Sequence, residues 1–226
     1  NTAYKIFQLK YKSFIIFFLF LRVLYLPCLL VSVLFVACTE SFTDPRDGQS
    51  YDVVKIGGLI WFAENLNFVT EGSVCPEGDN RNCDKYGRLY TWDVAQAACP
   101  EGWHLPDSAD FATLVEQAGG ADFAGGMAVA GEKLKSTGGW FKKGNGTDAF
   151  GFNALPAGYR GAVYEGEGGA LVGGAYDGIG GYAYFWSATA TPDDLAYYLF
   201  LDFSSKAASM NAFPKGDFRS VRCVYR

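Results

Sequence analysis

The sequence predicts an α+β domain in which antiparallel strands and two helices occupy separate parts of the chain. Glycine accounts for 28 of the 226 residues and aromatic residues for 17%, which is typical of a β-rich domain with long loops and excludes a disordered chain. The hydrophobic patterns run in the order hairpin, helices, loops and strands. They lack the regular alternation of strand and helix that a doubly wound parallel sheet requires.

Residues 1–37 predict an export signal, which we set apart from the fold. Nearly every residue from Ser13 to Ala37 is apolar. Val23–Ala37 follows the positive charge of Arg22 and ends in a small residue before Cys38, which is the pattern of a secretory signal. The apolar run is also long enough for a membrane helix, so a signal anchor is the alternative.

The residues around Cys38 resemble the lipobox of bacterial lipoproteins, in which a small residue precedes the cysteine that receives a diacylglycerol. The match is Leu34-Phe35-Val36-Ala37-Cys38. The resemblance implies lipidation of Cys38 and a lipid anchor in the cell envelope, on the outer membrane. Several acyl chains together hold a protein at a membrane stably.

The exported part of the chain is acidic. Residues 1–37 carry four basic side chains and no acidic ones, so the other 189 residues hold nine more acidic than basic groups. Nucleic-acid-binding domains normally present a basic face. We therefore expect no nucleic-acid partner.

A tether and a β-hairpin are predicted first along the exported part. Residues 38–50 are polar and predict the tether. Two β-rich runs, Tyr51–Ile56 and Leu59–Phe62, flank Gly57-Gly58, and glycines adopt the positive φ of a tight turn without steric cost. The polar stretch 71–85 then predicts a loop.

Two helices are predicted after this loop. Residues 90–99 place Trp92, Ala95 and Cys99 on one face, at spacings of three and four residues. The second helix begins at the capping pair Asp107-Ser108 and ends at Gly119-Gly120. Its apolar stripe consists of Phe111, Leu114, Val115 and Ala118.

The C-terminal half predicts loops followed by strands. Residues 119–181 contain 20 of the 28 glycines and no helical period, so we expect a long irregular region. Four runs rich in aromatic and β-branched residues then predict strands. These runs are 182–188, 196–203, 207–213 and 219–225.

Four cysteines lie beyond Cys38, and an even number in an exported chain indicates disulfides. They allow three connectivities. Cys75 and Cys83 share one short polar loop, which favours the pairs Cys75–Cys83 and Cys99–Cys223. A metal site is the alternative, but the cysteine spacing is not that of a zinc site and the only histidine is His104. We expect no metal and no cofactor.

Together, several motifs resemble the Fibrobacter succinogenes major paralogous domain, a family of largely secreted or lipid-anchored bacterial proteins without an established activity. The matching segments are Trp61–Leu66, Tyr86–Trp92, Cys99–Pro106, Leu134–Ser136 with Trp140, Gly151–Arg160, Phe185–Thr189 and Ser220–Val224. The resemblance runs from about residue 43 to 226 and implies a single domain over 51–226.

The arrangement is also similar to a remote C-type-lectin-like domain. In that fold, a helix with Trp, Ala and Cys precedes long loops, and a cysteine in the final strand pairs back to the helix. Cys99 and Cys223 match these two roles. The triplets of calcium-dependent sugar-binding lectins are absent from the sequence. The formylglycine-generating enzymes share the fold class, but they need a cysteine pair in the C-terminal half, where this chain has only Cys223.

Aromatic residues in and beside the glycine-rich region are the candidate ligand-binding residues. Rings on loops stack on sugars or anchor a protein partner, and the alternative is core packing beneath the loops. Arg160 would clamp a carboxylate or form an internal ion pair. The candidates are Trp140, Tyr164, Tyr176, Tyr182, Tyr184 and Arg160.

For several other polar residues, a structural role is a simpler interpretation than a functional one. A catalytic His104 would require a partner carboxylate or nucleophile. Asn65 would cap loop backbone. Three carboxylates on the glycine-rich loops would hold Ca²⁺ or lie in solvent. These are Glu165, Glu167 and Asp177.

We therefore expect a non-catalytic, lipid-anchored binding module of the cell surface, with a polysaccharide or an envelope protein as its ligand. One alternative is a structural protein of the envelope without a soluble ligand. A smaller alternative is an oxidase related to the formylglycine-generating enzymes.

Overall fold

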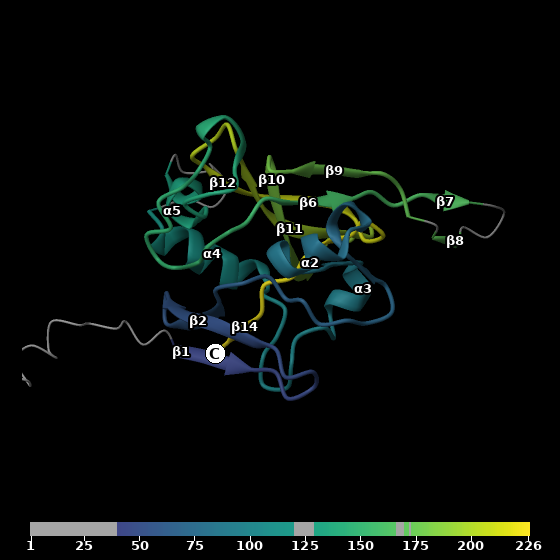
Figure 1. Cartoon of the computed structure of the whole chain (residues 1–226), viewed down its shortest axis with the longest axis horizontal. Helices are drawn as coiled ribbons and strands as arrows, with labels where there is room; N and C mark the ends of the chain where they lie inside the picture. The colour runs from purple at the N-terminus through teal and green to yellow at the C-terminus, as the bar shows by residue number, and fades with distance from the viewer. Residues whose placement is uncertain (1–39, 120–128, 166–169, 172) are drawn as a thin grey trace, which may run out of the picture. The chain divides into compact units, whose positions relative to one another are not determined.

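Strand pairing groups the domain into two main sheets and two short two-stranded sheets (Figure 1). The computed structural model describes residues 40–119, 129–165, 170–171 and 173–226. The segment Thr39–Arg226 is one compact unit. Strands predominate and the helices are short, so the α+β class is confirmed. The predicted signal and Cys38 lie outside the described residues.

The first sheet contains the predicted hairpin. Its strand order is β1-β2-β3-β14, and every neighbouring pair is antiparallel. Ile56 pairs with Leu59 across the turn, where Gly57 and Gly58 have φ of 62° and 84°. The strands are β1 (Glu40–Thr43), β2 (Ser50–Ile56), β3 (Leu59–Phe62) and β14 (Val224–Tyr225).

The prediction of a tether over 38–50 is wrong for Glu40–Thr43, which forms β1 and pairs with β2. The Phe42 ring stacks on Phe62 at 5.8 Å and lies 5.2 Å from Trp103. A single apolar residue in a polar stretch shows no period, so only its tertiary contacts identify this strand.

The second sheet has six strands in the order β12-β11-β10-β13-β5-β4. Its three long strands confirm the predicted runs from 182 to 213. The predicted run 219–225 is split between the two sheets, and β13 lies parallel to β10, the one exception to antiparallel pairing among the described strands. The strands are β4 (Ser73–Val74), β5 (Leu89–Tyr90), β10 (Tyr182–Ala190), β11 (Leu195–Asp202), β12 (Ala208–Pro214) and β13 (Arg219–Ser220).

The helices are shorter and more numerous than the two predicted. α4 (Ser108–Gln117) confirms the second prediction, with Asp107 and Asp110 forming a capping box. α3 spans only Trp92–Ala95 of the predicted 90–99. The structure also contains α2 (Asn80–Tyr86) and α5 (Ala130–Leu134), and two 3₁₀ turns, η1 (Pro76–Gly78) and η2 (Phe141–Lys143).

The helix α2 replaces part of the predicted polar loop 71–85. Only Cys83 and Tyr86 of this helix are buried, and local polar contacts stabilise it as well. The Asp79 carboxylate accepts the backbone N–H of Arg81 at 2.9 Å, which caps the helix. The disulfide Cys75–Cys83 then ties the helix to the chain before it.

The glycine-rich region contains regular pieces as well as loops. Strand β6 (Ala157–Arg160) pairs antiparallel with β9 (Tyr176–Ile179), and β7 (Tyr164–Glu165) pairs with β8 (Ala170–Leu171). The prediction of one long irregular region over 119–181 is therefore only partly right. Figure 1 shows β6 and β9 side by side next to β10.

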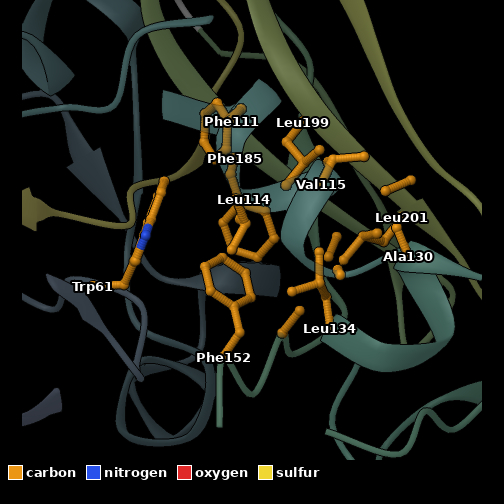
Figure 2. Packing of buried hydrophobic residues seen from close by; sticks show 14 of the residues in the cluster. Trp61, Phe111, Leu114, Val115, Ala130, Leu134, Phe152, Phe185, Leu199 and Leu201 are labelled. Carbon is orange, nitrogen blue, oxygen red and sulfur yellow. The ribbon is translucent and has the colours of Figure 1, made fainter. Parts of the chain in front are cut away.

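The main core lies between the two helices α4 and α5 and the faces of both sheets (Figure 2). The ring centroid of Trp61 in β3 lies 5.7 Å from that of Phe111 in α4 and 5.7 Å from that of Phe152. Phe152 in turn lies 5.8 Å from Phe185 of β10. Each of these fully buried side chains contributes about 1.5–3 kcal/mol. The core thus joins both sheets into one support for the loops.

Both predicted disulfides are present. Cys75 and Cys83 are eight residues apart, whereas Cys99–Cys223 closes a span of 124 residues. Every cysteine of the described region is thereby paired, so that region holds no thiol pair for chemistry of the formylglycine-generating type.

Buried tyrosines predict a loss of stability in alkali. Burial raises the pKa of Tyr51 to about 12 and raises the pKa of Tyr90 and Tyr184 as well. The unfolded chain therefore releases these protons first, from about pH 10. We expect the contribution of these tyrosines to the free energy of unfolding to be constant below about pH 9 and to fall as the pH rises through 10 to 12.

Denaturant titrations at several pH values measure this slope, and a matched variant assigns it. Tyr51→Phe removes the hydroxyl that accepts the Asn67 N–H at 3.1 Å and should reduce the alkaline slope. An equal slope for Tyr51→Phe and the wild type would contradict the assignment to Tyr51.

Candidate functional site

A surface hollow of about 500 Å³ forms where β9, β10, η1 and η2 meet. Aromatic rings and two carboxylates line it, and we call it the aromatic hollow. The β6–β9 pairing and the turn at Gly180-Gly181 bring these separate segments together. Its lining includes Phe141, Tyr176, Tyr182, Phe203, Glu77 and Asp177.

The rings of the aromatic hollow hold one another in place. Phe203 lies 6.4 Å from Phe141 and 6.1 Å from Tyr182, both in edge-on geometry. The Phe141 N–H donates to the Gly180 carbonyl at 2.8 Å, which docks η2 on the turn before β10. Phe141 is nevertheless 54% exposed, so its ring faces solvent at the rim of the hollow.

Two exposed carboxylates add hydrogen-bond acceptors to the rim. Glu77 belongs to η1 and has a φ of 56°, and Asp177 belongs to β9. Neither forms an ion pair with any other described residue. η1 directly follows Cys75 and contacts β9, so the short disulfide loop places Glu77 at the hollow. Rings beside free carboxylates form a surface that is both apolar and hydrogen-bonding.

The structure separates the predicted ligand residues. Tyr176 and Tyr182 line the aromatic hollow. The Arg160 guanidinium lies 5.3 Å from the Tyr176 ring centroid, and its Nε donates to the Gly174 carbonyl at 3.1 Å. Arg160 thus packs against one ring of the hollow but does not line it. Tyr164 lies in β7, and its side chain is outside the described residues.

Trp140 is a core residue. It is 6% exposed, and its Nε1 donates to Ser136 Oγ at 3.0 Å and to the Ala154 carbonyl at 3.2 Å. Its indole therefore already has its partners within the fold. Trp140 does not line the aromatic hollow.

Tyr184 packs on the sheet face behind the hollow. Its ring lies 5.1 Å from Phe200 and 5.2 Å from Tyr159. The Arg219 guanidinium lies 4.7 Å from the same ring and pairs with Asp217 at 2.8 Å. Burial lowers the pKa of Arg219, with Asp217 acting in the opposite direction. These contacts make Tyr184 part of the support for β10.

Three residues of the aromatic hollow are not among the ligand residues that the sequence predicts, namely Phe141, Phe203 and Glu77. Phe203 ends a predicted strand, and Glu77 lies in the segment 71–85, which predicts a loop. The run Trp140-Phe141-Lys142-Lys143 carried a usable signal, because an aromatic residue next to two lysines is poorly suited to a core.

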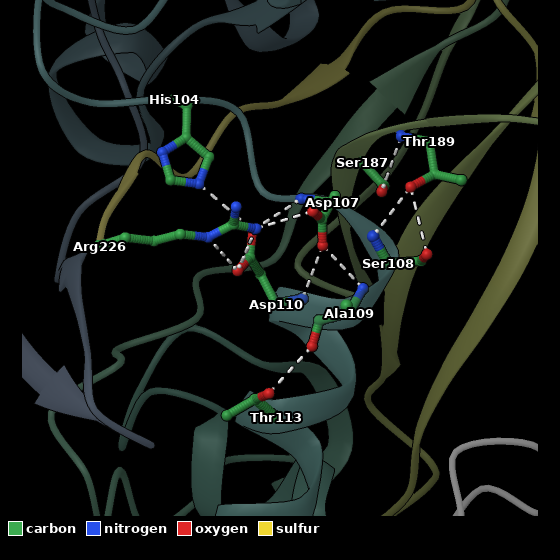
Figure 3. Close-up of polar contacts among 9 residues, drawn as sticks. All are labelled: His104, Asp107, Ser108, Ala109, Asp110, Thr113, Ser187, Thr189 and Arg226. Atoms are coloured by element: carbon green, nitrogen blue, oxygen red, sulfur yellow. Dashed lines mark hydrogen bonds and ion pairs between the residues drawn. The ribbon is translucent and has the colours of Figure 1, made fainter.

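His104 belongs to a polar cluster that fixes the start of α4 (Figure 3). Its Nε2 lies 3.3 Å from Asp110 Oδ2, and Arg226 contacts both Asp110 and Asp107. The His104 backbone also bridges to Val224 in both directions. Among the described residues, no hydroxyl or thiol hydrogen-bonds to the His104 ring. His104 does have a partner carboxylate, but Asp110 is also bound by Arg226 and by the Asp107 N–H in the cap of α4, so the geometry agrees with the structural interpretation of His104.

Asn65 also has a structural role. Its Nδ2 donates to the Tyr86 carbonyl at 2.8 Å, and its Oδ1 accepts from Arg222 at 2.6 Å. It is 3% exposed, so it bridges backbone and side chain inside the fold, consistent with the capping interpretation.

In the part of the chain that the structure describes, no group of three or more His, Cys, Asp and Glu side chains is arranged to hold a metal ion. None of its helices has the length and apolar character needed to cross a bilayer.

The fold and the aromatic hollow define a disulfide-linked α+β domain that presents aromatic rings on loops. A family model, the Fibrobacter succinogenes major domain, matches residues 54–225, and the chain belongs to this family. Comparison with curated proteins and with solved structures gave no significant match.

Proposed function

We propose that this protein is a non-catalytic binding module of the cell surface whose ligand is a polysaccharide. The aromatic hollow is the observation that carries the proposal. A sugar ring has apolar C–H faces and a polar hydroxyl edge, and the hollow offers aromatic faces next to free carboxylates. Phe141 and Tyr182 would contact the sugar face, and Glu77 and Asp177 would accept hydrogen bonds from its hydroxyls.

The N-terminal sequence supports the proposed location of the protein at the cell surface. The signal pattern over residues 1–37 and the lipobox-like run ending at Cys38 support export and a lipid anchor on the outer membrane. A hollow on loops, with a rigid core behind it, suits a domain that meets ligands outside the cell.

The fold that we propose for this domain is C-type-lectin-like. In its support, the disulfide Cys99–Cys223 joins the turn after α3 to the chain just before β14. Long loops also separate the helices from the late strands. This pairing is the one that the resemblance to C-type-lectin-like domains implies.

Binding to a panel of polysaccharides tests the proposal. The full chain is purified in a mild detergent. Its migration should be slowed in affinity gels that contain its polysaccharide ligand. Retention of envelope proteins instead would favour a protein ligand. Self-association without any ligand, measured by light scattering, would favour a structural protein of the envelope.

The variant Phe141→Ala should weaken polysaccharide binding about five- to twentyfold, because it removes an exposed stacking ring. Isothermal titration calorimetry measures the change. Phe213→Ala is the matched control, since Phe213 is 48% exposed and does not line the aromatic hollow. Equal affinities of the two variants would count against the hollow as the binding site.

A further inference from the structure

A second hollow of about 410 Å³ lies next to the aromatic hollow and shares Phe203 with it. We call it the lysine hollow. It forms where the loop after α5 meets the turn between β11 and β12. Figure 1 shows the backbone of these two segments, the green loop beside the yellow turn near β12. Its lining includes Lys135, Lys142, Lys143, Lys206, Glu132 and Phe203.

The lysines of this hollow differ in their partners. Lys206 Nζ pairs with Glu132 at 3.0 Å. Lys135 is buried, and its Nζ donates to the carbonyls of Asp202 and Ser205 at 2.9 and 2.8 Å. Lys142 and Lys143 form no ion pair with any other residue in the described part of the chain. Two exposed cations thus remain without a counter-charge, on a domain that is acidic overall.

The backbone that carries these two cations is strained. Lys142 and Lys143 have φ of 48° and 65°, a region that costs an ordinary side chain about 1–2 kcal/mol. Short hydrogen bonds hold the segment, from Gly144 N–H to the Phe141 carbonyl at 2.7 Å and from Trp140 N–H to Asn145 Oδ1 at 3.1 Å. Glycine would adopt these angles freely. Backbone strain of this kind clusters at active sites and ligand-binding segments, which supports a functional hypothesis for these two residues.

Lys142 connects the two hollows. Its Nζ lies 5.6 Å from the centroid of Phe203, the ring that lines both of them. An anionic group of a ligand, held by Lys142 and Lys143, would therefore lie beside a sugar ring of the same ligand in the aromatic hollow.

We infer that the lysine hollow is an anion subsite and that the ligand is an acidic polysaccharide, with a carboxylate or sulfate group at Lys142 and Lys143. The inference rests on the proposed polysaccharide function and narrows it to one class of ligand. Lysine ammonium groups supply charge-assisted hydrogen bonds to either anion. Their attraction is screened by salt, whereas stacking on rings is not.

The test compares matched acidic and neutral glycans on the full chain in mild detergent. The probes are polygalacturonate, its fully methyl-esterified form, dextran sulfate and dextran, together with polyglutamate as a non-glycan polyanion. We expect at least one acidic glycan to bind about tenfold more tightly than its neutral partner, with an affinity that falls as salt rises.

The double variant Lys142→Asn/Lys143→Asn removes both charges but suits the backbone, because asparagine tolerates positive φ better than lysine. We expect it to keep or raise the wild-type Tm and to lose the preference for the acidic glycan. The control, Lys55→Gln/Lys85→Gln, makes the same charge change at exposed positions outside both hollows and should keep the preference.

The outcomes separate this inference from the proposed function. If acidic and neutral glycans bind equally, or the Asn variant keeps the preference, the anion subsite is refuted while the polysaccharide function stands. If the wild type binds no glycan of either kind, the proposed function itself fails. Binding of polyglutamate without any glycan would point to an acidic protein partner and would also overturn the inference.

Discussion

Replacing Arg222 with methionine is expected to cost about 3–5 kcal/mol of the free energy of unfolding. Arg222 is fully buried, and its guanidinium donates to the carbonyls of Phe62 and Phe152 and to Asn65 Oδ1. Methionine would fill part of the space but would leave these acceptors without donors. Since domains of this kind are stable by about 5–15 kcal/mol, the loss is a large fraction of the total.

The position of Arg222 explains why the effect should be large. The side chain links the end of β3 to the segment at Phe152, and through Asn65 to the end of α2. Burial lowers its pKa to about 9, because desolvation penalises the charged form. The group is still charged at neutral pH, so its hydrogen bonds are charge-assisted. Its face also covers the Phe152 ring, 4.4 Å from the centroid.

Two further variants make the Arg222 prediction specific. Arg222→Lys keeps the charge but not the planar fork, so it should lie between wild type and Arg222→Met in stability. Arg81→Met is the control, since the Arg81 side chain is 90% exposed, and it should leave the Tm unchanged. Thermal and urea unfolding by circular dichroism measure all three. A Tm for Arg222→Met equal to that of Arg81→Met would refute the role assigned to Arg222.

Removal of the long-range disulfide is expected to destabilise the domain more than removal of the local one. Cys99–Cys223 closes a span of 124 residues and Cys75–Cys83 a span of eight. Loop-closure entropy gives about 5 kcal/mol for the first and about 2.6 kcal/mol for the second. For a domain of this size, each kcal/mol corresponds to about 2–4 °C in Tm.

Paired alanine variants separate the two disulfides. Cys99→Ala/Cys223→Ala should lower the Tm by about 10–20 °C, and Cys75→Ala/Cys83→Ala by about half as much. Binding should show the opposite order, because Cys75 directly precedes η1 and so positions Glu77 at the aromatic hollow. Differential scanning calorimetry with titration of a polysaccharide measures both effects. An equal or larger loss of Tm for the Cys75–Cys83 variant would contradict the entropic explanation.

Much of the fold could be predicted because its signals are local. The hairpin β2–β3 depends on two adjacent glycines between β-rich runs, and α4 on the cap at Asp107 followed by an apolar stripe. The strands β10, β11 and β12 are long enough to show their own composition. In each case the residues that define the element are neighbours in the sequence.

The errors occur where an element depends on partners far away in the sequence. β1 is recognisable only by its pairing with β2 and by the packing of Phe42. The run 219–225 has strand composition throughout, yet the chain passes from one sheet to the other within it. Arg222, at the crossing, uses its side chain to bond two separate backbone segments, at Phe62 and at Phe152-Asn153, instead of continuing a ladder.

By itself, the sequence determined the family, the α+β class, the order of the main elements and the favoured cysteine pairing. The tertiary structure alone decided which aromatic residues are exposed. Trp140 and Phe141 are neighbours, yet one is 6% exposed in the core and the other is 54% exposed at the aromatic hollow. Residues in an irregular loop have no period that marks an inner face. Whether such a ring is covered therefore depends on which other segment packs against it, as the chain at Ala154 does on Trp140.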